Sequence, residues 1–200
     1  IFELIPTERG RLVFQEERVL TGGEQNQNDT LIGEGNQETF LNVSPSDGRE
    51  IASRIKGVAT YHFQDSGSSA PPKEAVHIQE NRRLYSDAGN LAAVLYRLKK
   101  QQPDAYRLIR RTVQRVVPQF GDFVLRPATH NEDTIRLQWQ EKGEEYVFGA
   151  HQLSDGTLRF ICLATLFLQP DPPATTIVDE PELGLHPHAL GVLAGMVRSA

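Results

Sequence analysis

The order of elements in the C-terminal third most constrains what this chain can fold into. Residues 158–168 are apolar on nearly every side, which is typical of a helix buried all round. An Asp-Pro-Pro break at 171–173 is followed by the β-branched run 175–178, which ends in the pair Asp179-Glu180. Such a run favours a buried strand with acids at its carboxyl end. Pro187 then suits the first turn of another helix. This alternation predicts an α/β fold.

The first 63 residues are expected to form an antiparallel β meander. β-branched and aromatic runs alternate there with Gly-, Asn- and Ser-rich turn signals. The runs cover residues 11–14, 38–43 and 57–63, and the turns cover 21–23, 33–36 and 44–48. A short helix is predicted over 50–56. The Ser-, Gly- and Pro-rich stretch 64–73 is typical of a loop.

Two amphipathic helices are predicted to follow. The first begins with Asn90 as its N-cap and stops at Pro103. The second begins with Asp104 as its cap and ends at Pro118. Beyond them, strands are expected over 123–125 and 134–139 as a hairpin, with a third strand over 146–148.

The charge of the chain is unevenly distributed. Residues 82–116 carry nine Lys and Arg against two Asp and Glu, whereas the whole chain has 21 basic and 26 acidic residues. A basic segment on an acidic body is typical of a surface for nucleic acid or an acidic partner. The alternative is that these charges are the solvated faces of two helices, and the sequence leaves both interpretations open.

Several classes of protein and site are disfavoured by composition. No apolar stretch approaches the ~20 residues of a membrane span. The single cysteine, Cys162, cannot form an internal disulfide and lies in the apolar helix, so we expect an inert thiol in a cytoplasmic protein. His186 and His188 are two residues apart, which does not match a common zinc pattern.

Two short motifs carry candidate chemistry. Ser154 and Gly156 begin the apolar helix, where a hydroxyl, free amides and the positive end of the helix dipole could hold a phosphate. The alternative is an ordinary helix cap. Asp179 could hold Mg²⁺, and Glu180 could orient and deprotonate a water molecule. The alternative is a pair of acids solvated at a strand end.

The order and spacing of these motifs resemble the ABC ATPase superfamily. Residues 153–157 (LSDGT) look like its signature motif, 176–181 (TIVDEP) like its Walker B motif, and 182–187 (ELGLHP) like its D-loop. The amino-acid sequence of these motifs is more similar still to that of bacterial predicted ATPases of AAA type that are built like RecF and SMC heads. Residues 89–98 also resemble that group.

The resemblance implies roles for particular residues. Ser154 and Gly156 would contact the γ-phosphate of ATP held by the opposite subunit of a homodimer. Arg159 would link the signature helix to its neighbours, and residues 182–186 would lie at the subunit interface. The implied ATP-binding set is Ser154, Asp155, Gly156, Thr157, Arg159, Glu182 and His186, with Asp179 for Mg²⁺ and Glu180 as catalytic base. Asp155 replaces the glycine that is usual in transporter signatures.

The implied fold is an ABC-type P-loop NTPase head with a mixed sheet. A mainly parallel core would carry the Walker B strand beside the meander and a helical lobe. In this interpretation residues 1–73 are the β-rich part, 74–119 the helical lobe and 120–200 the signature and Walker B part of one ATPase domain.

Other parts of such a head are not found in the sequence. None of the 16 glycines is followed by lysine, so no Walker A loop is present, and we expect it upstream of Ile1. The switch residue is expected beyond Ala200. Gln64 is a poor candidate for the Q-loop glutamine because a Ser/Gly-rich loop follows it. The 200 residues alone are therefore expected to be a fragment without activity.

The implied function is ATP hydrolysis by dimerising heads, coupled in related proteins to DNA repair or phage defence. DNA would contact the basic helices between Arg82 and Arg115. One alternative is an ATP-gated interaction module that does not hydrolyse, although Glu180 argues against it. Another is a transporter nucleotide-binding domain, which the Asp in the signature and the turn at 182–187 disfavour.

Overall fold

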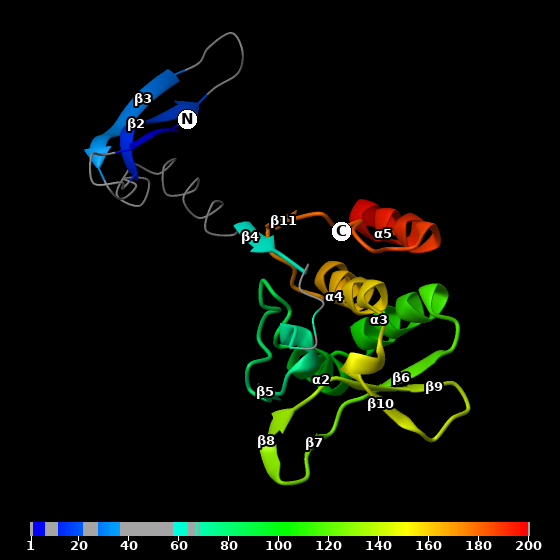
Figure 1. Ribbon diagram of the computed structural model, residues 1–200. Helices are drawn as coiled ribbons and strands as arrows, with labels where there is room; N and C mark the ends of the chain where they lie inside the picture. The colour runs from blue at the N-terminus through cyan, green and yellow to red at the C-terminus, as the bar shows by residue number, and fades with distance from the viewer. Residues whose placement is uncertain are drawn as a thin grey trace. The chain divides into compact units, whose positions relative to one another are not determined.

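The computed structural model describes residues 2–6, 12–21, 28–36, 58–63, 67 and 69–199 (Figure 1). The chain divides into two compact units, Ile1–Val58 and Ala59–Ala200. The boundary between them falls inside the β-rich part that the sequence predicts. No helix among these described residues is long and apolar enough to cross a membrane.

The first unit contains an antiparallel three-stranded sheet. Strands β1 (Phe2–Pro6), β2 (Leu12–Thr21) and β3 (Asn28–Asn36) pair in that order, as expected of a meander. The turn predicted at 33–36 is wrong, because Gly33 and Glu34 pair with Glu17 and Glu16 of β2. Pairing with a neighbouring strand here outweighs the local preference of glycine for turns. The strand predicted at 38–43 and the helix at 50–56 lie outside the described residues.

The second unit is built around one buried helix. Helix α4 (Asp155–Leu168) contacts all three other described α-helices, α2 (Leu91–Gln101), α3 (Pro103–Val116) and α5 (Pro187–Ser199). Figure 1 shows α4 between α3 and α5. Phe160, Ile161 and Leu163 are fully buried in it. Burying a side chain of this size contributes about 1.5–3 kcal/mol, so the continuous apolar run determines the centre of the unit, as predicted.

An antiparallel sheet of three strands packs beside the helices. It has the order β10 (Val147–Gly149), β9 (Gln138–Glu141), β6 (Phe120–Val124). Trp139 stacks between Phe120 and Phe148, with ring centroids 5.9 and 4.8 Å away. These aromatic pairs across strands fix the register of the sheet.

The single strand predicted over 134–139 is wrong. Its first part belongs to β8 (Asn131–Ile135), which pairs with β5 (Val76–His77) and β7 (Pro127–Ala128) in a separate sheet. Its last part begins β9. The chain leaves one sheet for the other between them, because each half has different partners: Ile135 lies opposite Val76, and Gln138 lies opposite Val124.

The Walker B-like strand is less buried than predicted. Strand β11 (Thr175–Val178) pairs with β4 (Val58–Tyr61), and no other described strand joins this sheet. Ile177 is therefore 53% exposed. The described residues thus form an α/β fold. Of the mainly parallel core that was expected around β11, they contain only the pair of β4 and β11.

Asn90 is the N-cap residue of α2, as predicted, but its side chain makes no capping hydrogen bond to the helix. Its side chain is fully buried and points instead into the preceding loop. Oδ1 accepts a hydrogen bond from Tyr85 N at 2.8 Å, and Nδ2 donates to Glu80 O and Arg83 O, each at 2.7 Å. These loop groups have no regular partner, so the amide satisfies them in place of the helix amides.

Asp104 does not cap α3, contrary to the prediction. That helix begins at Pro103. The fixed φ of proline suits the first helical position, and proline has no backbone N–H that would need a hydrogen-bond partner there. Asp104 consequently lies in the first turn, where it pairs with Arg107.

Candidate functional site

The first part of the site is the start of α4, which is a capped helix end as predicted. Ser154 has extended backbone, and its Oγ accepts a hydrogen bond from Thr157 N at 3.2 Å. The Ser154 hydroxyl also lies 2.8 Å from Thr157 Oγ1. Ser154 is exposed and Gly156 is partly exposed. First-turn amides at such an end have no partner within the helix, and the helix dipole favours an anion beside them.

The second part is the pair of acids after β11. Asp179 N donates to Tyr61 O of β4 at 3.2 Å, so the strand pairing continues up to the acids. Both carboxylates are exposed. His62, which follows β4, places Nδ1 3.5 Å from Asp179 Oδ2.

Glu180 has an unusual backbone. Its φ is +42°, in the left-handed region that residues other than glycine seldom adopt. Such a conformation costs about 1–3 kcal/mol and is found mostly where surrounding structure holds it in place, often at functional sites. Here the following turn holds it, because Glu180 O accepts a hydrogen bond from Leu183 N at 3.2 Å.

The turn after the acids is held by its own backbone. Leu185 N donates to Glu182 O at 3.0 Å, and Gly184 has a φ of +73° that suits glycine. His186 O accepts from Leu190 N at 3.2 Å, which connects the turn to α5. Glu182 and His186 are both exposed on it.

The two parts of the site meet at α4. A Cβ added to Gly156 would overlap Gly184 O and lie 3.3 Å from Gly184 C, so only glycine allows the turn this close to the helix. Arg159, one turn further along and 7% exposed, donates from Nε to Phe63 O at 2.8 Å and from Nη1 to Leu183 O. One buried guanidinium thus connects the helix, the segment that follows β4 and the turn.

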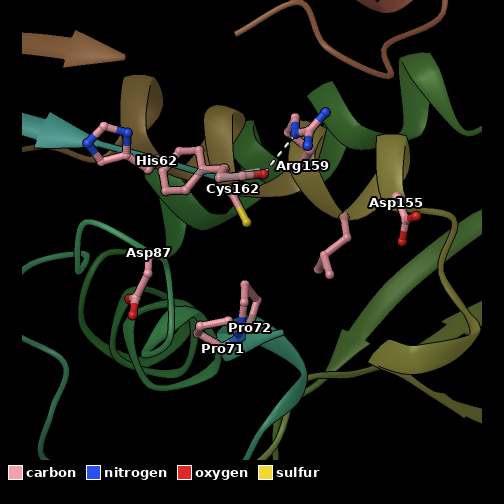
Figure 2. A pocket seen from close by; sticks show the side chains of 9 residues that line it. His62, Pro71, Pro72, Asp87, Asp155, Arg159 and Cys162 are labelled. Carbon is pink, nitrogen blue, oxygen red and sulfur yellow. Dashed lines mark hydrogen bonds between the residues drawn. The ribbon is translucent and has the colours of Figure 1, made fainter. Parts of the chain in front are cut away.

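A small cleft lies under the first turns of α4 (Figure 2). Its volume of about 20 Å³ has room for about one water molecule and not for a nucleotide. Asp87 and Asp155 line it together with Arg159 and the Cys162 thiol, whose sulfur points into it. Burial raises the pKa of Cys162 to about 12, so this thiol stays protonated at neutral pH. It is inert, as its place in the helix predicts.

The residues present fit a Mg²⁺–nucleotide ligand in their chemistry. Among the described residues no group of three or more His, Cys, Asp and Glu could hold a metal ion. Mg²⁺ commonly takes one or two carboxylates and completes its shell with water and phosphate oxygens, so a single exposed Asp179 is a suitable ligand. The start of α4 is suitable for phosphate oxygens.

Gln64, the candidate for the Q-loop glutamine, lies outside the described residues.

Some basic residues of the helical lobe contact other parts of the chain. Lys99 and Arg110 are directed at Asp122, at 3.2 and 3.6 Å, and Asp122 also accepts a hydrogen bond from Tyr106 Oη at 2.6 Å. Burial, followed by this hydrogen bond, raises the pKa of Tyr106. Arg97 donates to a loop carbonyl at 2.8 Å. The exposed basic residues outside these contacts are Arg82, Arg83, Lys100, Arg107, Arg111 and Arg115.

Sequence reasoning missed two residues near the predicted site. His62 lies beside Asp179, and Lys73 places Nζ 3.5 Å from Asp155 Oδ1. Both come from segments about 80 to 120 residues away in the chain. The Pro-Pro-Lys sequence around Lys73 gave no sign of this position, whereas the place of His62 at the end of a predicted strand could have suggested it.

One comparison with known proteins finds a relationship. A family model described as "AAA domain, putative AbiEii toxin, Type IV TA system" matches residues 25–200, which is most of the chain. The match includes the start of α4, the acids after β11 and the turn between them and α5. No curated protein and no solved structure matches the chain significantly.

Proposed function

The chain belongs to the AAA-domain family whose model it matches, and from this premise we propose that it forms part of an ATPase head of the RecF/SMC-like ABC type. Membership gives it a nucleotide-binding domain of ATPase type. The observation that carries the finer proposal is the packing of the turn after Glu180 against the first turn of α4, through Gly156 and Arg159. Within one head, the signature-like helix start is thereby packed against the turn that follows the Walker B-like acid pair.

The proposal assigns phosphate binding to the start of α4. The Ser154 hydroxyl and the first-turn amides near Gly156 would bind the γ-phosphate of ATP held by a second copy of the head. The turn with Glu182 and His186 would lie at the interface between the two copies. The loop that holds the β-phosphate is not part of these 200 residues.

The proposal assigns the reaction to the two acids. Glu180 would orient a water molecule and take its proton as the water oxygen bonds to the γ-phosphorus. The bond from the γ-phosphorus to the β–γ bridging oxygen breaks, which leaves ADP and inorganic phosphate. Asp179 would hold Mg²⁺, which neutralises charge on the phosphate oxygens when bound. The strained backbone of Glu180 supports a functional role, because nothing in an ordinary strand end requires it.

Phosphate release from ATP by the full-length protein tests this assignment. We expect Glu180→Gln to lower the rate by at least about 100-fold, as is usual when a general base is lost. Glu144→Gln, an exposed acid in the β9–β10 loop, is the matched control and should retain the wild-type rate. Equal activity of the wild type and Glu180→Gln would refute the role of Glu180. Tight ATP binding without hydrolysis by the wild type would instead indicate an ATP-gated interaction module.

The proposal extends to DNA as the partner of the helical lobe. Arg111 and Arg115 are exposed and four residues apart, so they share one face of α3. Phosphate contacts by such residues make binding strongly dependent on salt. Fluorescence anisotropy of a labelled duplex at low salt should show binding that Arg111→Glu/Arg115→Glu weakens and that Arg198→Glu on α5 does not. Absence of binding at low salt, or equal loss in both variants, would refute this extension.

A further inference from the structure

A carboxylate occupies the position at the start of α4 where the proposed function places a phosphate. Asp155 stands between Ser154 and Gly156, and its side chain is 59% exposed. An acid in the first turn stabilises the helix through the dipole. The same negative charge repels a triphosphate approaching the first-turn amides, because like charges at short range disfavour each other even near the surface.

Lys73 lies where it can neutralise this charge. Its Nζ is 3.5 Å from Asp155 Oδ1 and donates to Gly67 O at 3.1 Å. The side chain is only 7% exposed, which is unusual for a lysine and means that its ammonium is held in place.

The backbone around Lys73 is itself fixed. Lys73 ends the short 3₁₀ helix η1 (Pro71–Lys73), whose two prolines restrict φ. Helix η1 contacts a second one, η2 (Ala150–Gln152), which leads directly into Ser154. The lysine and the start of α4 are thus parts of one packed arrangement.

Other charged residues line the cleft that Asp155 lines. Asp87 lines the same cleft as Asp155, on its opposite side (Figure 2). Arg159, which also lines the cleft, donates to the carbonyls of Phe63 and Leu183. Removal of the Lys73 charge would leave this end of α4 negative.

We infer that Lys73 is a positioning residue for ATP. The lysine neutralises Asp155, so that the start of α4 can accept the γ-phosphate. The inference rests on the proposed function. It predicts that Lys73 is needed only because Asp155 is an acid, and that removing both charges restores ATP binding. A merely structural lysine would not show this dependence.

The test measures ATP-dependent dimerisation of the full-length protein in a Glu180→Gln background. Mass photometry at increasing ATP with Mg²⁺ gives the half-maximal concentration. We expect Lys73→Met to raise it about tenfold, as one uncompensated charge near a phosphate would. Asp155→Asn should lower it below the value of the parent, because the repelling carboxylate is gone, and Lys73→Met/Asp155→Asn should return to within about threefold of the parent.

Two further variants keep the test decisive. Lys142→Met should leave the half-maximal ATP concentration unchanged. It removes a lysine that is distant from Lys73 in the sequence and donates to Pro118 O at 2.8 Å. Lys73→Arg keeps the charge and should remain within about threefold of the parent, even if Lys73→Met folds poorly.

The outcomes separate the two proposals. If the parent dimerises with ATP but the double variant is as impaired as Lys73→Met, or a folded Lys73→Arg is equally impaired, the inference about Lys73 is overturned. If Lys73→Met behaves like the parent, it is overturned as well. If the parent itself neither binds ATP nor dimerises, the proposed function fails and the inference fails with it.

Discussion

The close approach of two glycines predicts a large effect from one added methyl group. In Gly156→Ala the new Cβ would overlap Gly184 O and lie 3.3 Å from Gly184 C. These are backbone atoms of a turn with its own hydrogen bonds, so they cannot move aside as a flexible side chain can. Overpacking of this kind costs about 1–3 kcal/mol. The better helix propensity of alanine offsets at most about 1 kcal/mol.

We therefore expect Gly156→Ala to lower the free energy of unfolding by about 1–2 kcal/mol. For a unit of this size the midpoint of thermal unfolding should fall by about 2–4 °C per kcal/mol. Circular dichroism during heating and urea titration of the chain measures both quantities.

Two glycines of α5 are the matched controls. A Cβ added to Gly191 or Gly195 meets nothing within 4 Å. Gly191→Ala and Gly195→Ala should each raise the free energy of unfolding by about 0.5–1 kcal/mol, because only the propensity term remains. A Gly156→Ala protein as stable as these controls would refute the packing of the turn against α4.

Three further predictions concern buried polar groups. Arg159→Met removes the donors to two carbonyls and should destabilise the chain by about 2–4 kcal/mol in urea titration, whereas exposed Arg198→Met should change stability by less than about 0.5 kcal/mol. Asn90→Ala leaves three loop groups without their partner and should cost about 2–4 kcal/mol, against less than about 1 kcal/mol for exposed Asn131→Ala; equal losses would contradict its anchoring role. Because burial raises the pKa of Cys162 to about 12 from 9.0, its contribution to stability is fully present below about pH 9 and is lost as pH rises towards 12. Urea titrations across this range should show a smaller alkaline loss in Cys162→Ala than in the wild type, and an identical loss would contradict the burial.

Local features of the sequence were sufficient to predict the start and core of α4. The apolar run in α4 has no polar side to expose, so any compact fold must bury it. Ser154 as a cap and Pro187 at the start of α5 follow from the immediate neighbours of each residue. The antiparallel meander predicted for the first 63 residues is found only in part: β2 overlaps the predicted run 11–14, but the predicted turn 33–36 lies in β3, and the predicted strand 57–63 pairs, as β4, with β11.

Features that depend on distant partners could not be predicted in this way. Arg159 bonds to a carbonyl 96 residues earlier in the chain, and Lys73 meets Asp155 across a similar separation. Asn90 has the residue type of a cap, but the unsatisfied loop backbone beside it competes for the same amide. The exposure of β11 depends on which strands lie beside it, and its own β-branched residues do not specify that.

The most direct test of the central proposal is the mass in solution of the full-length Glu180→Gln protein, with and without ATP and Mg²⁺. Loss of the base should trap ATP between two heads, so the account predicts a shift from monomer to dimer when ATP is added. Ser154→Arg in the same background fills the start of α4 with a bulky side chain and should abolish the shift while ATP binding persists. A protein that binds ATP and stays monomeric, or that dimerises equally well with Ser154→Arg, would contradict the proposal that α4 binds the nucleotide of a second head.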